Sequence, residues 1–61
     1  MNLEQLKQAY PSATSKEEAL EQAKIYQRYA QQAIRAARWD KSAGAEDAQH
    51  AHNLKQLAEQ L

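Results

Sequence analysis

The sequence predicts an all-α protein, and three observations support this fold class. Ala, Gln, Glu, Leu, Lys and Arg dominate the 61 residues, whereas Gly and Pro occur once each and Phe is absent. Apolar residues recur at helical spacing along most of the chain. A capping-box pattern, Ser15 followed by Glu18, opens the longest such segment. We expect one small domain, a short N-terminal helix followed by a long antiparallel helical hairpin.

The first helix is expected over residues 2–10. Asn2 can cap it, with Gln5 three residues later to complete the cap. Pro11 ends it, because proline moves the preceding residue out of the helical region. The apolar stripe of this helix is Leu3, Leu6 and Tyr10. A helix this short is marginal alone, so we expect the stripe to dock on the hairpin.

The second helix is expected over residues 15–41, and its apolar arc is too wide for a single neighbouring helix. Many of the apolar side chains are small, and small side chains let helix axes approach closely. Such a short chain buries only about 60% of the surface that its unfolded form exposes. We therefore expect a homodimer formed through this face. Its members are Ala23, Tyr26, Ala30, Ala33 and Ala37.

Gly44 is expected to separate the second helix from a third over residues 45–60. Glycine suits the left-handed position that follows many helices. The alternative is one helix continuing through Gly44, which costs only about 1 kcal/mol relative to alanine. In the hairpin, the third helix presents a leucine-rich stripe, and these leucines are expected to fill the space opposite the alanines of the second helix.

Basic residues gather in the middle of the chain although the formal net charge is zero. Residues 24–41 carry five Lys or Arg side chains against a single acidic one, Asp40. With Gln31 included, spacings of four, three, four and three residues place Lys24, Arg28, Arg35 and Arg38 along one ridge of the second helix. An exposed Trp beside Arg is common at the energetic centre of protein interfaces. The predicted partner-binding residues are Lys24, Arg28, Gln31, Arg35, Arg38 and Trp39.

No constellation in the sequence points to catalysis, a metal or a cofactor. Cysteine is absent, and His50 and His52 stand two apart on a helix, so they cannot share a metal ion. We interpret His50 as a partly buried histidine near Glu46 and Asp47. The hydroxyl side chains lie at expected turns and caps, where they serve the backbone. We therefore expect no enzyme activity, no metal and no cofactor.

The sequence favours a small protein–protein interaction module, an adaptor, inhibitor or assembly factor of the kind common among bacterial and phage accessory proteins. Its partner is expected to be a larger protein with an acidic groove. One alternative is a nucleic-acid or nucleotide binder that uses the same ridge, doubled in a dimer. Another is a purely structural oligomer. With no signal peptide and no apolar run that could span a membrane, we expect a complete cytoplasmic protein.

Overall fold

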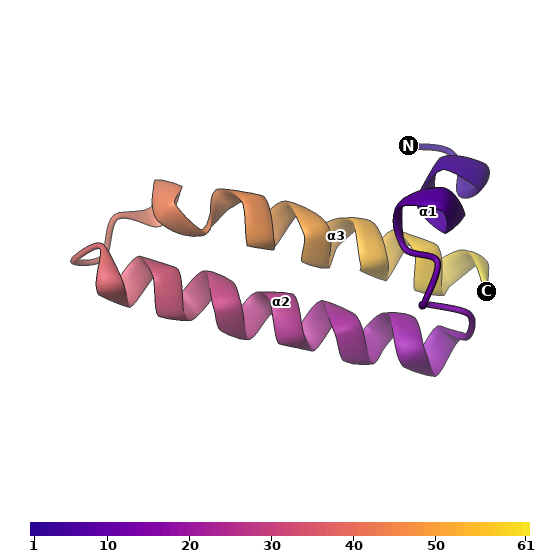
Figure 1. Cartoon of the computed structure of the whole chain (residues 1–61), viewed down its shortest axis with the longest axis horizontal. Coiled ribbons are helices and arrows are strands. Elements are labelled where there is room, and N and C mark those ends of the chain that lie inside the picture. Colours follow the sequence, from indigo (N-terminus) through magenta and orange to yellow (C-terminus); the bar gives the residue numbers. More distant parts are fainter.

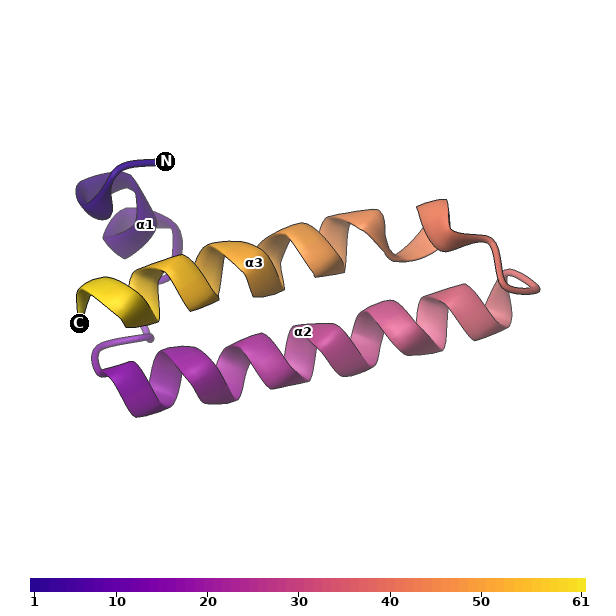
Figure 2. The ribbon, with the colours of Figure 1, turned by 180° about the vertical axis from the view of Figure 1, so that it is seen from behind.

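A computed structural model describes all residues from 1 to 61 and confirms the all-α hairpin. Helix α1 spans Leu3–Ala9, α2 spans Lys16–Ala36 and α3 spans Ala45–Gln60, and the short 3-10 helix η1, Lys41–Gly44, precedes α3. Helices α2 and α3 lie antiparallel and side by side (Figure 1). Seen from behind, α1 again lies beside the end of α3 that carries the C-terminus (Figure 2).

The two predicted helix starts are confirmed by their caps. In α1, the side chain of Asn2 accepts a hydrogen bond from the Gln5 backbone N–H at 2.9 Å, and the Gln5 side chain accepts from the Asn2 N–H at 3.0 Å. In α2, Ser15 Oγ accepts from the Glu18 N–H at 3.2 Å. The Glu18 carboxylate accepts from the N–H and hydroxyl of Thr14 and not from Ser15, so only half of the predicted capping box forms. These bonds satisfy backbone donors that have no partner inside the first turn of a helix.

Leucines of α3 pack against alanines of α2, as the sequence predicts. Leu54 and Leu57 are fully buried, and Ala19 and Ala23 belong to the same cluster. Burying a leucine contributes about 1.5–3 kcal/mol, and the small alanines allow the large side chains to fit between two close helices. From α1, Leu6 adds a third fully buried leucine to this core.

The packing of α3 uses the face of α2 that the sequence suggests for self-association. Ala23 is 1% exposed and Ala30 is 6% exposed, with Tyr26 and Ala33 half-buried beside them. Ala37 is exposed and lies beyond the end of α2. Ala23 and Ala30, at the centre of this face, are therefore covered within the chain itself and offer almost no exposed surface to a second copy.

Gly44 is buried where the start of α3 crosses close to α2. A Cβ atom placed on Gly44 would lie 2.8 Å from the carbonyl oxygen of Ala30 and 3.1 Å from Cγ1 of Ile34. The φ angle of Gly44 is −100°, so the expectation of a left-handed glycine is wrong. The hairpin break is confirmed, but glycine is needed there for close approach and not for an unusual backbone angle.

A polar and aromatic contact joins the end of α1 to α3. The hydroxyl of Tyr10 lies 2.6 Å from Nδ1 of His50 and accepts a hydrogen bond from Nδ2 of Asn53 at 3.2 Å. The Tyr10 and His50 rings meet edge to face, and the ring of Tyr26 of α2 also contacts His50, at a centroid distance of 4.9 Å. His50 is exposed, whereas the sequence suggested a partly buried histidine, and its ring contacts are with Tyr10 and Tyr26.

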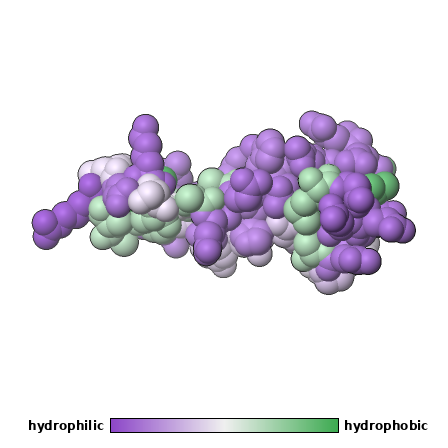
Figure 3. All heavy atoms as spheres, turned by 90° about the horizontal axis from the view of Figure 1, so that it is seen from above, coloured by the Kyte–Doolittle hydropathy of each residue, from purple (hydrophilic) through white to green (hydrophobic).

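The molecule is thin, because most of the hairpin has no third helix on it. Its extents are 36 × 20 × 16 Å, and one helix with its side chains is about 10–12 Å across. Seen from above, the surface is mainly hydrophilic, and its apolar atoms lie in small separate areas (Figure 3). None of the helices has an apolar stretch long enough to cross a bilayer.

Replacing Gly44 with alanine should destabilise the fold. The added methyl group meets the Ala30 carbonyl, which belongs to the backbone of α2 and cannot rotate away. We expect a loss of about 1–3 kcal/mol in the free energy of unfolding, measured by urea denaturation followed by circular dichroism. As a control, Ala43→Ser adds one atom at an exposed position of η1 and should change stability by less than about 0.5 kcal/mol.

Removing the Tyr10 hydroxyl should loosen the attachment of α1. Tyr10→Phe keeps the buried ring but leaves His50 and Asn53 without their shared partner. We expect the free energy of unfolding, measured by thermal denaturation, to fall by about 0.5–1.5 kcal/mol. Tyr29→Phe is the matched control, because the Tyr29 ring is 51% exposed and its hydroxyl has no partner within the chain. Equal effects of the two substitutions would contradict a specific role for the Tyr10 contact.

Candidate partner-binding groove

An open groove of about 780 Å³ runs along one side of the seam between α2 and α3. Its apolar lining is small and comes from both helices, with Ala30 and Ile34 on α2 and Ala48 and Ala51 on α3. The other lining residues are four cations, three glutamines and a histidine. These are Lys24, Arg28, Arg35 and Lys55, then Gln27, Gln31 and Gln32, and His52.

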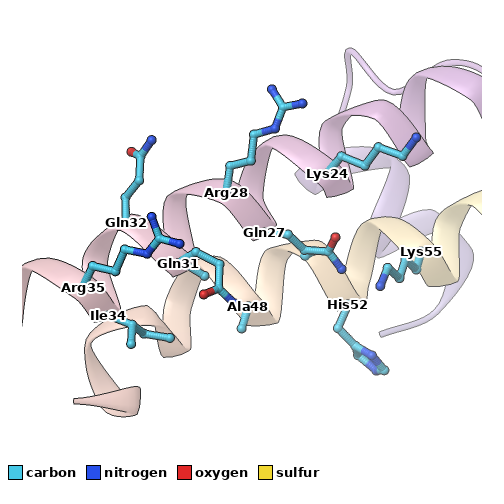
Figure 4. A pocket seen from close by; sticks show the side chains of 12 residues that line it. Lys24, Gln27, Arg28, Gln31, Gln32, Ile34, Arg35, Ala48, His52 and Lys55 are labelled. Carbon is cyan, nitrogen blue, oxygen red and sulfur yellow. The ribbon is translucent and has the colours of Figure 1, made fainter. Parts of the chain in front are cut away.

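The positions on α2 follow from its helical repeat. Lys24, Arg28 and Arg35 are spaced by four and seven residues, and such side chains stand above one another on one side of a helix. Four of the six residues predicted for partner binding therefore line the groove together, namely Lys24, Arg28, Gln31 and Arg35. In Figure 4, Gln27 and Gln31 lie over the seam between the helices, while Arg28 projects from α2 on the side away from α3.

Helix α3 adds Lys55 and His52 to the groove, and the sequence prediction missed both. Ala48, His52 and Lys55 follow a spacing of four and three residues, so they share one side of α3. That stripe lies next to the buried leucines of α3. This position beside the buried face is the signal in the sequence that would have predicted its place in the groove. The imidazole of His52 points away from α2 (Figure 4), and its Nε2 lies 3.2 Å from Nε2 of Gln56.

No carboxylate lines the groove, although the chain carries as many acidic as basic residues. Four positively charged side chains therefore border a low apolar strip, and no carboxylate shares the groove with them. Clustered charge of one sign raises the potential over a concave surface well above that of the neutral molecule as a whole. This arrangement can attract and orient an anionic group.

Arg38 and Trp39 do not belong to the groove, because α2 ends at Ala36 and not near residue 41 as expected. Both residues have left-handed backbone angles, with φ of 56° and 71°. The Arg38 N–H donates to the Arg35 carbonyl at 3.2 Å and the Trp39 N–H to the Ile34 carbonyl at 2.7 Å. These two bonds form a Schellman motif, which turns the chain away from the helix axis.

Trp39 consequently stands at the tip of the hairpin and is 69% exposed. The predicted neighbourhood of Trp39 with Arg28 and Arg35 depended on a continuous helix, and the turn removes it. The sequence signal for this turn was weak. A Schellman motif usually has glycine at its left-handed position, whereas here the left-handed positions hold arginine and tryptophan.

Asp40 follows the turn and caps η1. Its carboxylate accepts hydrogen bonds from Ser42 Oγ at 2.7 Å and from the Ser42 N–H at 3.0 Å, and these bonds lower the pKa of Asp40 below its usual value. Both bonds favour the ionised carboxylate, so the cap is strongest above the usual pKa and weakens as the pH falls through the lowered value. Asp40 bonds within the turn and does not line the groove.

No group of three or more side chains that could hold a metal ion occurs in the structure. Comparison with known proteins gives no further information on the site, since no family model, no curated protein and no solved structure matches this chain. The groove geometry is therefore the basis for any functional conclusion.

Placing glycine at residue 38 should stabilise the hairpin tip. The left-handed backbone at Arg38 is sterically unfavourable for a residue with a Cβ atom, and Arg38→Gly removes this strain. We therefore expect the free energy of unfolding, measured by thermal denaturation, to rise by about 1 kcal/mol. Ala37→Gly is the control in the same turn. Ala37 has φ −92° and ψ 24°, so glycine there only adds unfolded-state entropy and should cost about 0.5–1 kcal/mol. Shifts of the same sign would contradict the motif.

Proposed function

We propose that this protein is a non-enzymatic binding module that holds an acidic, amphipathic helix of a larger protein in the groove between α2 and α3. The observation that carries this proposal is the lining itself, an apolar strip flanked by four cations and by no carboxylate. The sequence suggested an acidic groove on the partner. Because the groove belongs to this chain, the partner is instead expected to contribute the inserted helix.

The size of the apolar lining favours a helix with larger apolar side chains. The nearly buried Ala30 and Ala51 form the floor of the groove, the exposed Ala48 and the half-buried Ile34 border it, and these mostly short side chains leave space above the seam. An amphipathic helix laid on this strip would complete a three-helix bundle along the part of the hairpin that α1 does not cover. Helix-in-groove recognition of this kind relies on apolar anchors one turn apart.

The cation spacing defines the charge pattern of the partner helix. Lys24, Arg28 and Arg35 follow one another at about 6 and 10.5 Å along the axis of α2, taking 1.5 Å per residue. Carboxylates spaced by four and seven residues on a helix lying alongside α2 would match these distances. Lys55 extends the positive rim to the other wall of the groove.

Two observations favour a protein partner over nucleic acid. No Phe, Tyr or Trp side chain lines the groove, and its one ring, the imidazole of His52, points away from α2 (Figure 4), so no large aromatic platform for base stacking lies among the cations. The formal net charge of zero also differs from the basic excess that is typical of phosphate-binding domains. If the protein were only a structural oligomer, the absence of carboxylates from the groove would have no explanation.

The test is titration calorimetry with two synthetic helices and one oligonucleotide. The first peptide carries leucines along one face and glutamates spaced by four and seven residues, the second has the same composition in scrambled order, and the third probe is a single-stranded DNA. We expect the ordered peptide to bind best. The double variant Arg35→Glu with Lys55→Glu should weaken its binding by at least about tenfold, because two attractive rim charges become repulsive.

The matched control is Lys7→Glu with Arg38→Glu, which makes the same change in net charge at exposed positions outside the groove. This variant should bind the ordered peptide almost as well as the wild-type protein. Equal loss in the two double variants would refute the groove. Tighter, steeply salt-dependent binding of the DNA would replace the protein partner with a nucleic acid.

A further inference from the structure

The side of α2 that faces away from α3 carries a second, shallower hollow made by that helix alone. Its lining residues are Glu17, Leu20, Glu21, Lys24, Ile25 and Arg28. Leu20 and Ile25 are each 40% exposed, although both are large apolar side chains in the middle of an ordered helix. No other helix lines this hollow, because α3 packs against the opposite side of α2 and α1 packs on α3.

We propose that this outer side of α2 binds the same side of a second copy of the chain, with the two helices antiparallel. Charge supplies the reason for the direction. The hollow is acidic toward the start of α2, at Glu17 and Glu21, and basic toward its middle, at Lys24 and Arg28. An antiparallel pair brings unlike ends together, whereas a parallel pair would bring Glu21 against Glu21 and Arg28 against Arg28.

The same charges define the register. Glu21 and Arg28 lie two turns apart on nearly the same side of α2, so they cannot pair directly within one helix. A two-fold axis passing between residues 24 and 25 places Glu21 of each copy opposite Arg28 of the other. The contact therefore occurs twice in the dimer, as the symmetry of an isologous interface requires.

The apolar side chains fit this register. Ile25 lies next to the two-fold axis and meets Ile25 of the second copy, and Leu20 lies near the edge beside the aliphatic part of Arg28 of that copy. The two-fold axis of an antiparallel pair runs across both helices, so a side chain on one flank of the contact has its copy on the same flank. The two Ile25 side chains are therefore neighbours. Burial of these exposed apolar groups adds an attraction that does not depend on salt.

The outer hollow and the groove overlap only in part. Lys24 and Arg28 border both, but Glu21 and Ile25 line only the outer hollow, and Arg35 and Lys55 line only the groove. Figure 4 shows Arg28 directed away from α3, where it can reach a second copy.

The test is a charge exchange measured by sedimentation equilibrium over a dilution series, with helicity checked by circular dichroism. Glu21→Arg puts arginine opposite Arg28 of the second copy, and Arg28→Glu puts glutamate opposite Glu21. Each single variant should weaken dimerisation by at least about tenfold. The double variant Glu21→Arg with Arg28→Glu re-forms the pair in reversed order and should return to within about threefold of the wild-type dissociation constant.

Two controls change the same charges elsewhere. Glu59→Arg and Lys55→Glu both alter exposed side chains of α3, outside the hollow, and should leave dimerisation unchanged while the second weakens peptide binding in the groove. A wild-type chain that stays monomeric at every concentration would overturn the proposal. So would a double variant no better than the single ones, because the antiparallel register would then be wrong.

Discussion

The contact between the leucines of α3 and the alanines of α2 is the constraint on which the rest of the molecule depends. Leu54 and Leu57 can be fully buried only because Ala19 and Ala23 offer a flat, narrow surface opposite them. The same small residues continue to Ala30, against which Gly44 packs at the other end of the hairpin. The two helices therefore stay close along their length, and polar side chains beside the seam become the walls of a groove.

The end of α2 decides which basic residues share that groove. Up to Arg35 the helical repeat keeps the cations on one side, and the Schellman motif then directs Arg38 and Trp39 elsewhere. The turn also brings Asp40 to the start of η1, whose last residue, Gly44, packs against the backbone of α2. The left-handed backbone conformation of these two residues therefore separates the basic groove from the exposed tryptophan at the tip.

The fold could be predicted from the sequence, because the signals for it are local. The caps at Asn2 and Ser15 and the spacing of the leucines each depend on residues within a few positions of one another. The end of α2 could not be predicted, since no glycine or proline marks it. The role of Gly44 was also hidden, because the reason for it is a carbonyl fourteen residues away in the chain, on Ala30.

The candidate site was predicted in part for the same reason. Its α2 wall depends on helical spacing alone, whereas Lys55 joins it only through the pairing of two helices. Self-association was predicted from the wide apolar arc of α2, but the sequence cannot tell which part of such an arc the chain covers by itself. The structure shows Ala23 and Ala30 covered and Leu20 and Ile25 exposed.

The Tyr10 contact has a consequence for how the molecule opens. Helix α1 is only seven residues long and packs on α3. It is attached to the hairpin only by the contacts of Leu6, Tyr10 and their neighbours. Short segments with few buried contacts open in local fluctuations that leave the remaining structure intact. The amide protons of α1 should therefore exchange with solvent sooner than those at the centre of α2 and α3, and a protease would reach the N-terminal segment while the hairpin is still folded.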